Sequence, residues 1–336
     1  MKDKKPLGVI TMGDPAGIGP EIIVKLAAER SLPKIPIVVI GNAGVLEKSA
    51  SSLSLPLSIK KLDPAAEKSQ FSAGDLNVIH VGEEIVDCPQ GKPSDVGGMA
   101  SAQYISLATR LALENRIDFI VTCPISKEAL HLAGYNYAGH TEMFADLTST
   151  SDFAMMLTAK ELSVVLVTTH VPVKALPSLI KKAAVLRVIR LVHRDFARWK
   201  GKAPSIGIAA LNPHGGEGGI FGREEVEEII PAVQEARAEG ICISLPLPAD
   251  TLFSKNKREG FDVIIAMYHD QGLIPLKMLS FGMAVNVTLG LPFVRTSVDH
   301  GTAYDIAGKG IADSKSLREA LTLAFEMVHR PFPKSS

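Results

Sequence analysis

The stretch DVIIAMYHDQG, from Asp262 to Gly272, places an uninterrupted apolar run directly before a histidine, an aspartate and a glycine. Because no polar residue alternates along the run, the pattern is typical of a strand that is covered on both faces, as in a parallel sheet. In open α/β sheets, ligand-binding residues follow the carboxyl ends of such strands. His269 therefore stands at a position where chemistry is expected.

Two other stretches repeat this arrangement: VVLVTTH ends at His170, and SIGIAALNPH ends at His214. A single histidine after a strand is more often structural than a ligand, but three at equivalent places favour a shared site. Their separations match no local zinc motif, so this prediction depends on the repeated strand-end placement alone. Three neutral imidazoles leave coordination positions open on a metal, which is the pattern of catalytic sites.

Length and composition limit the classes of protein that fit. At ~150 residues per domain, 336 residues suggest about two domains. Lys+Arg and Asp+Glu both number 36, so no basic excess indicates a nucleic-acid partner. Three cysteines without a CxxC spacing fit a reduced cytoplasm. The first apolar run is shorter than a signal peptide's, and none approaches the ~20 residues of a membrane span, so we expect a cytoplasmic protein without membrane contact.

Strand-like and helix-like segments alternate along the chain, which predicts a doubly wound, mainly parallel α/β protein. The expected strands cover residues 7–12, 35–41, 76–81, 117–122, 163–169, 205–211, 262–268 and 284–290. The expected helices cover residues 21–30, 100–114, 173–199, 224–240 and 316–329.

A glycine-rich turn, MGDPAGIGPE, joins the first strand to the first helix. Gly13, Gly17 and Gly19 allow sharp turns and close approach of a ligand, and Pro20 suits the first turn of a helix with free amides. The turn is therefore a possible anion or cofactor loop. It matches neither GxGxxG nor the Walker A sequence, and a tight connection without a ligand is the alternative interpretation.

Further segments offer groups for binding an anion. LNPHGGEGG continues from His214 into a glycine-rich loop, for which a flexible surface loop is the alternative. A phosphate needs cations together with hydroxyl and amide donors. Such groups are present at His140, Thr141, Lys277, Asn286 and Arg295. Taken singly, the lysine and the arginine would be solvated surface charges in most proteins.

Seven segments together resemble the 4-hydroxythreonine-4-phosphate dehydrogenase family, whose members are NAD-dependent enzymes of pyridoxal 5′-phosphate biosynthesis. The segments are GDPAGIGPE, GHTE, TTH, LNPHGGEGG, LPADTLF, AMYHDQGLIPLK and VNVTLGLPFVRTSVDHGTAYDIAGKG, and the resemblance runs from about Gly8 to the C-terminal helix. GIGPE and HGTAYDIAGKG are also similar to segments of isopropylmalate and isocitrate dehydrogenases.

The resemblance implies a fold of two α/β/α domains with mainly parallel sheets, like isopropylmalate dehydrogenase, and an active site in the interdomain cleft. An outer domain with cofactor-binding segments would comprise residues 1–125 and 295–336. A central domain with the metal site and the dimer contact would comprise residues 126–294. The implied assembly is a homodimer in which the partner completes the metal site.

The implied reaction is the oxidation and decarboxylation of 4-phosphohydroxy-L-threonine to 3-amino-2-oxopropyl phosphate, with NAD and one divalent metal (Zn, Mg, Co or Mn). Similar enzymes act on 4-phospho-D-threonate or 4-phospho-D-erythronate, and the metal and phosphate motifs do not separate these substrates. A phosphoacyl transferase and a non-catalytic phosphometabolite-binding protein are two further hypotheses. The three strand-end histidines favour the dehydrogenase over both.

The resemblance also implies roles for individual residues. His170, His214 and His269 would bind the metal, and His140, Thr141, Lys277, Asn286 and Arg295 would bind substrate. The cofactor would lie against the segments containing Gly13, Gly17, Gly19, His300, Gly301 and Asp305. A proton acceptor is also required, for which Asp250, Asp270 and Lys277 are candidates by residue type only.

Overall fold

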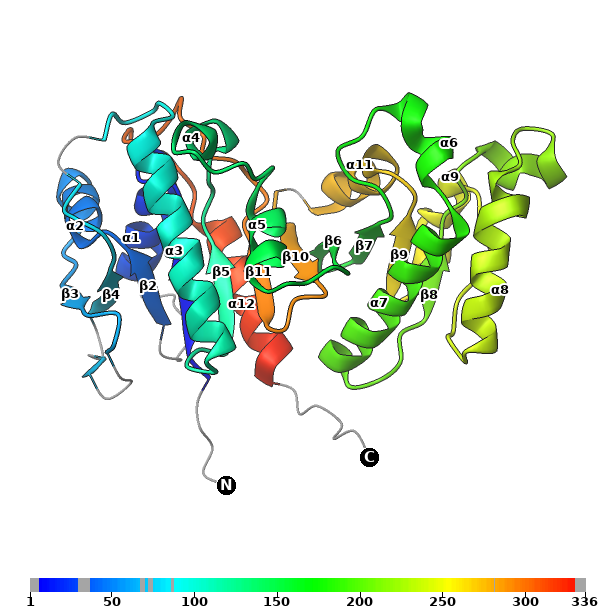
Figure 1. Ribbon diagram of the computed structural model, residues 1–336, viewed down its shortest axis with the longest axis horizontal. Helices are drawn as coiled ribbons and strands as arrows, with labels where there is room; N and C mark the ends of the chain where they lie inside the picture. The colour runs from blue at the N-terminus through cyan, green and yellow to red at the C-terminus, as the bar shows by residue number, and fades with distance from the viewer. Residues whose placement is uncertain are drawn as a thin grey trace, which may run out of the picture. The chain divides into compact units, whose positions relative to one another are not determined.

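The computed structural model describes residues 6–29, 37–66, 70–71, 75–85, 88–280 and 282–329. The chain forms two compact units, and Figure 1 labels most of their helices and strands. Unit 1 extends up to Thr150 and resumes at Leu291–His329, while unit 2 contains Ser151–Gly290. The domain limits predicted at residues 125 and 295 remain a prediction.

Unit 1 has a parallel arrangement of strands in the order β3-β4-β2-β1-β5-β11. The strands are β1 (Gly8–Thr11), β2 (Ile37–Gly41), β3 (Ile59–Leu62), β4 (Leu76–His80), β5 (Phe119–Thr122) and β11 (Val294–Ser297). The helices are α1 (Gly19–Ala28), α2 (Ala43–Ser52), α3 (Asp95–Leu113), α4 (Lys127–Leu132), α5 (His140–Leu147) and α12 (Lys315–His329). β1 and β2 are buried at every position, which explains their unbroken apolar sequences.

Unit 2 has strands in the order β10-β6-β7-β9-β8, of which β7, β9 and β8 are parallel. β6 is antiparallel to both of its neighbours. The strands are β6 (Ala154–Ala159), β7 (Leu162–Leu166), β8 (Ile206–Ile208), β9 (Val263–Ala266) and β10 (Val285–Leu289). The predicted mainly parallel α/β class is confirmed.

The helical elements of unit 2 include several short turns. They are η2 (Val173–Ala175), α6 (Leu176–Leu179), α7 (Lys182–Lys200), η3 (Pro213–Gly219), η4 (Glu225–Ile229), α8 (Ile230–Ala238), α9 (Ala249–Leu252), α10 (Lys255–Arg258) and α11 (His269–Ser280). The prediction of one helix over residues 173–199 is wrong. Ile180 leaves helical geometry at ψ 83° and is fully buried, so the chain turns there before α7 begins.

Helix α11 packs on β7 and β9 through a core that includes Val164, Leu166, Ile264, Leu273 and Leu276. The contact is close because Gly272 carries no side chain: a Cβ there would lie 2.5 Å from Val164 Cγ1. The start of α11, and with it His269, is thereby held near the end of β7.

No helix in the described ranges is both long enough and apolar enough to cross a membrane. Cys88, Cys123 and Cys242 are free thiols, as the absence of a paired spacing predicts.

Candidate functional site

The three predicted metal ligands follow three neighbouring parallel strands of unit 2. β9 lies between β7 and β8, so the carboxyl ends of all three strands share one edge. His170 follows β7, His214 lies in η3 after β8, and His269 opens α11 after β9. The strand-end placement predicted from the apolar runs is therefore present.

Two of these histidines lie next to each other. The ring centroids of His170 and His269 are 5.5 Å apart, with the rings inclined by 42°. Asp270 Oδ1 is 2.7 Å from His269 Nδ1. A carboxylate on one ring nitrogen is the arrangement that orients a metal-binding histidine and leaves its other nitrogen for the metal. This pair fits a divalent metal as two of the three predicted ligands.

His214 does not join that pair in a group of three. Its side chain is 70% exposed, its Nδ1 lies 3.8 Å from Glu217 Oε1, and its ring lies beside that of Phe221. Among the described residues, no group of three His, Cys, Asp or Glu side chains gathers closely enough to hold a metal. Within one chain, the predicted ligand set is therefore only partly assembled.

The loop that carries His214 has an unusual backbone that is anchored at its base. All residues from His214 to Gly218 have positive φ, between 42° and 77°. The buried Glu225 accepts hydrogen bonds from the backbone amides of Leu211 (2.8 Å) and Asn212 (2.7 Å). Positive φ in a non-glycine residue is uncommon and persists where the surroundings enforce it. The sequence interpretation missed Glu225, although its position in a run of acids after the glycines was visible.

The remaining predicted residues of unit 2 occupy varied surroundings. Lys277 is exposed on α11, and Asp250 is exposed at the start of α9. Asn286 is on β10, and its side-chain oxygen is buried without a hydrogen-bond partner in the described structure. A buried amide oxygen of this kind is ready to accept a hydrogen bond from a ligand.

In unit 1, Arg295 and His140 both lie next to the ring of Phe144. Arg295 is 1% exposed, and its guanidinium donates a 2.6 Å hydrogen bond from Nη2 to Thr122 Oγ1. Its Cζ lies 5.6 Å from the centroid of the Phe144 ring, and the His140 ring stacks on the same phenylalanine at 6.4 Å. Thr141 follows His140 in the first turn of α5. The predicted phosphate-binding residues of unit 1 are thus brought together.

Burial sets the charge states in this cluster. Burial lowers the pKa of His140 well below 6.5, and the positive charge of Arg295 lowers it further. Burial also lowers the pKa of Arg295 to about 9, against the opposing influence of Glu142. His140 Nε2 is buried without a hydrogen-bond partner in the described structure. A neutral imidazole and a buried guanidinium together suit an anion that can neutralise the arginine. Thr122 and Phe144 were missed, since neither carries a recognisable sequence signal.

The two predicted cofactor segments lie against each other within unit 1. Ile18 N donates to Thr302 O at 3.0 Å, and a Cβ on Gly17 would lie 3.0 Å from the same oxygen. The chain also approaches itself at the other two glycines: Cβ atoms on Gly13 and Gly19 would lie 2.3 Å and 2.2 Å from backbone oxygens. These contacts explain the glycines without a ligand, as the tight-connection interpretation requires. His300 is partly buried, whereas Gly301 and Asp305 are exposed.

A buried carboxylate joins the same two segments. Asp14 is fully buried and accepts hydrogen bonds from Ala16 N (2.8 Å) and from Tyr304 Oη (2.6 Å). Burial raises the pKa of Asp14, and the Tyr304 and Ala16 hydrogen bonds oppose that rise.

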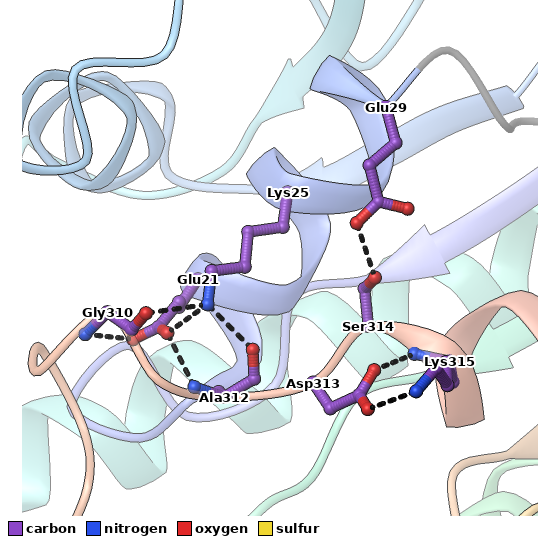
Figure 2. A network of polar contacts seen from close by, with 8 residues as sticks. All are labelled: Glu21, Lys25, Glu29, Gly310, Ala312, Asp313, Ser314 and Lys315. Atoms are coloured by element: carbon purple, nitrogen blue, oxygen red, sulfur yellow. Dashed lines mark hydrogen bonds and ion pairs between the residues drawn. The ribbon is translucent and has the colours of Figure 1, made fainter.

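A second polar contact holds the chain just beyond the predicted cofactor segment, which ends at Gly308. Figure 2 shows Glu21 and Lys25 of α1 reaching the backbone at Gly310 and Ala312. The sequence interpretation missed this pair, although its i,i+4 spacing in a helix is a recognisable signal.

Comparisons with known proteins agree across nearly the whole chain. The family model described as "Pyridoxal phosphate biosynthetic protein PdxA" matches residues 34–324. The D-threonate 4-phosphate dehydrogenase of Cupriavidus necator is 46% identical, covering 98% of this chain and 99% of that protein. The 4-hydroxythreonine-4-phosphate dehydrogenase of Geobacter metallireducens is 45% identical, covering 97% of each. The crystal structure of 4-hydroxythreonine-4-phosphate dehydrogenase from Klebsiella pneumoniae is 40% identical, with a TM-score of 0.89 and coverage of 98% and 100%.

Proposed function

The chain belongs to the pyridoxal phosphate biosynthetic protein PdxA family, and on that premise we propose that it is an NAD-dependent, divalent-metal-dependent oxidoreductase. Its proposed reaction is the oxidation and decarboxylation of 4-phosphohydroxy-L-threonine to 3-amino-2-oxopropyl phosphate. The adjacent imidazoles of His170 and His269 at neighbouring strand ends are the observation that supports this reaction most. The proposal includes a cytoplasmic location.

The proposed metal ligands are His170, His214 and His269. A divalent metal held there would supply Lewis-acid chemistry, which favours ionisation of a hydroxyl group and loss of carbon dioxide from a β-keto acid. Asp270 holds the His269 ring through Nδ1, so that Nε2 remains available. Because His214 does not join the other two histidines within one chain, we propose a homodimer in which His214 of one subunit completes the ligand set of the other.

The phosphate group of the substrate would be held by Arg295, His140 and Thr141. The buried guanidinium is a strong donor in water-poor surroundings, and the neutral His140 adds a hydrogen bond without repelling the arginine. Lys277 and Asn286 are further proposed substrate-binding residues. NAD is proposed to lie along the segments that contain Gly13, Gly17, Gly19, His300, Gly301 and Asp305.

A proton must leave the hydroxyl as the hydride is transferred. Asp250, Asp270 and Lys277 are the proposed acceptors. Asp270 already engages His269, which favours an orienting role for it. Individual D250N, D270N and K277M variants, assayed for single-turnover NADH formation, would identify the acceptor as the residue whose loss removes the step.

A second substrate, 4-phospho-D-threonate, is supported by one specific observation. Relatives named for that substrate and relatives named for 4-hydroxythreonine 4-phosphate have nearly the same identity to this chain. Both compounds carry a phosphate and a hydroxyl group beside a carboxylate-bearing carbon, so the same metal ligands and the same arginine would serve either.

The test is NADH formation from 4-phosphohydroxy-L-threonine, 4-phospho-D-threonate and 4-phospho-D-erythronate, each with and without chelator and added divalent metal. We expect turnover of at least one substrate, its loss on chelation and its return with metal. Folded, metal-loaded protein that oxidises none of the three would contradict the proposal. A phosphoacyl transferase would be active in the presence of chelator, whereas a binding protein would be stabilised by a ligand without forming NADH.

A further inference from the structure

The segment from His300 to Ala312 is held in place from outside by helix α1. Glu21 accepts hydrogen bonds from two backbone amides of the segment, Ala312 N at 2.8 Å and Gly310 N at 3.2 Å. Lys25, one helical turn later, donates to two backbone oxygens, Gly310 O at 2.9 Å and Ala312 O at 2.7 Å. Figure 2 shows both side chains directed at the same two residues.

The two side chains also form an ion pair with each other. Lys25 Nζ is 2.9 Å from Glu21 Oε1, and their side chains are only 22% and 5% exposed. Buried charges persist where each is paired and its remaining hydrogen-bonding capacity is filled. Here the backbone amides of the segment bond to Glu21, and its backbone oxygens accept from Lys25. The pair is therefore matched to one conformation of residues 310–312.

A second set of contacts holds the same segment nearer its start, at Thr302 and Tyr304. Tyr304 donates to the buried Asp14 at 2.6 Å, and Thr302 O accepts from Ile18 N at 3.0 Å. Ala303, between them, has φ +44°, a conformation that a non-glycine residue rarely adopts without outside support. The segment is thus fixed at both ends against the glycine-rich turn and α1.

We infer that Glu21 and Lys25 form a clamp that positions residues 300–312 for binding the nicotinamide dinucleotide, an inference that rests on the proposed dehydrogenase function. Neither side chain needs to touch the cofactor. Their part is to keep the segment in its binding conformation before the cofactor arrives. If only a fraction of the protein has the binding conformation, the apparent Kd equals the intrinsic Kd divided by that fraction.

The clamp is tested with E21Q, which keeps the size of the side chain but removes one acceptor oxygen and the charge. The double variant E21Q/K25M leaves no unpaired charge buried, so it serves if E21Q alone is unstable. E29Q is the matched control. Glu29 follows α1 directly and bonds to Ser314 Oγ at 3.1 Å and to Arg318, both beyond the clamped segment.

Two readouts are needed: the KM for NAD in turnover with the Kd for NADH by fluorescence titration, and amide hydrogen exchange of residues 300–312 in the cofactor-free protein. If the released segment is competent about a tenth of the time, KM and Kd rise about tenfold in E21Q and in the double variant. The kcat at saturating NAD stays within about twofold, because the competent state is restored by mass action. Exchange at Gly310 and Ala312 speeds up in both variants, and E29Q changes neither quantity.

Unchanged Kd for NADH in folded E21Q and E21Q/K25M would overturn the inference, whatever the exchange rates show. Unchanged exchange at Gly310 and Ala312 would overturn it too, because the clamp would then not hold the segment. These outcomes differ from failure of the proposed function, which is read from wild-type protein: an absence of turnover with all three substrates despite NADH binding. If wild-type protein binds no NADH, both the proposed function and the clamp are wrong.

Discussion

Arg295 and His140 show how burial, rather than residue type, sets the chemistry of single side chains here. An arginine on the surface would be an ordinary solvated charge, whereas Arg295 is 1% exposed and anchored to Thr122. Its burial costs free energy, because a charge removed from water is poorly solvated. A phosphate group bound beside the guanidinium would offset that cost, which supports the proposed assignment of the substrate phosphate to this position.

The first prediction concerns His140 and acid stability. Its pKa is lowered from 6.5 in the folded protein, so the unfolded chain binds the proton more readily below that pH. The resulting stability is complete above pH 6.5 and is lost as the pH falls, by up to about 1.4 kcal/mol per pH unit. H140N should flatten this acid limb in urea unfolding measured from pH 8 to pH 5. H131N, at an exposed histidine, is the control, and an H140N profile parallel to wild type would refute the prediction.

The second prediction concerns Arg295 and alkaline pH. Its pKa is lowered to about 9, so the guanidinium loses its charge above that pH, and kcat/KM for the phosphorylated substrate should fall about tenfold per pH unit there. Stability changes in the opposite direction: the unfolded arginine keeps its proton up to about pH 12.5, so this group favours folding increasingly between those values. R295K should move the alkaline decrease in kcat/KM to lower pH, since lysine is a weaker base than arginine. K277R should leave the pH of this decrease unchanged. If the decrease moves in K277R and not in R295K, it belongs to Lys277.

At the scale of elements, helix α11 links the core of unit 2 to the proposed metal site. The helix begins at His269, and Gly272 in its first turn allows the backbone to approach β7. Alanine is normally the better helix residue by about 1 kcal/mol, so a loss on substitution here reports packing and not helix propensity.

The third prediction follows from that contact. G272A would press a methyl group against Val164 and Ala266, at 2.5 Å and 3.0 Å, and displace the start of α11. We expect a loss of about 1–3 kcal/mol in unfolding free energy and a weaker affinity for Co²⁺ followed by its visible absorption. I274A, at an exposed position on the same helix, should change stability by less than about 0.5 kcal/mol. Co²⁺ affinity equal to wild type in G272A would show that α11 does not set the ligand geometry.

At the scale of the whole molecule, the partial gathering of the histidines requires an explanation. His170 and His269 lie together, while His214, after the neighbouring strand, contacts Glu217 and does not join them. A homodimer with shared ligands accounts for this, because a symmetric assembly exchanges the same residue in both directions. The domain limits and the subunit arrangement stay predictions.

The fourth prediction is subunit complementation. H214A and H269A are each expected to be inactive, but their heterodimer holds one complete set: His170 and His269 from the H214A subunit and His214 from the other. Random reassociation makes half of the dimers heterodimers with one working site each, so about a quarter of wild-type activity should return. H170A mixed with H269A has no complete set and should stay inactive. If H214A with H269A also stays inactive while differently tagged subunits co-purify as mixed dimers, the shared site is wrong.

The sequence by itself determined the fold class and the positions where chemistry begins. Buried parallel strands need unbroken apolar runs, and close turns need glycine; both are local requirements, visible in DVIIAMYHDQG and in GDPAGIGPE without any knowledge of neighbours. The family followed from the combination of such segments and is confirmed by the comparisons. The roles of the individual site residues remain predictions.

Only the tertiary structure decided which of these positions meet. The strand order β7-β9-β8 makes three separate histidines neighbours along one edge, and no local pattern encodes that order. Arg295 reaches Thr122 across 173 positions, and Tyr304 reaches Asp14 across 290. Such contacts arise when packed elements bring distant groups together, and burial then sets their charge. The orientation of His214 is likewise absent from the strand pattern, because it depends on a turn of consecutive positive φ angles anchored by Glu225.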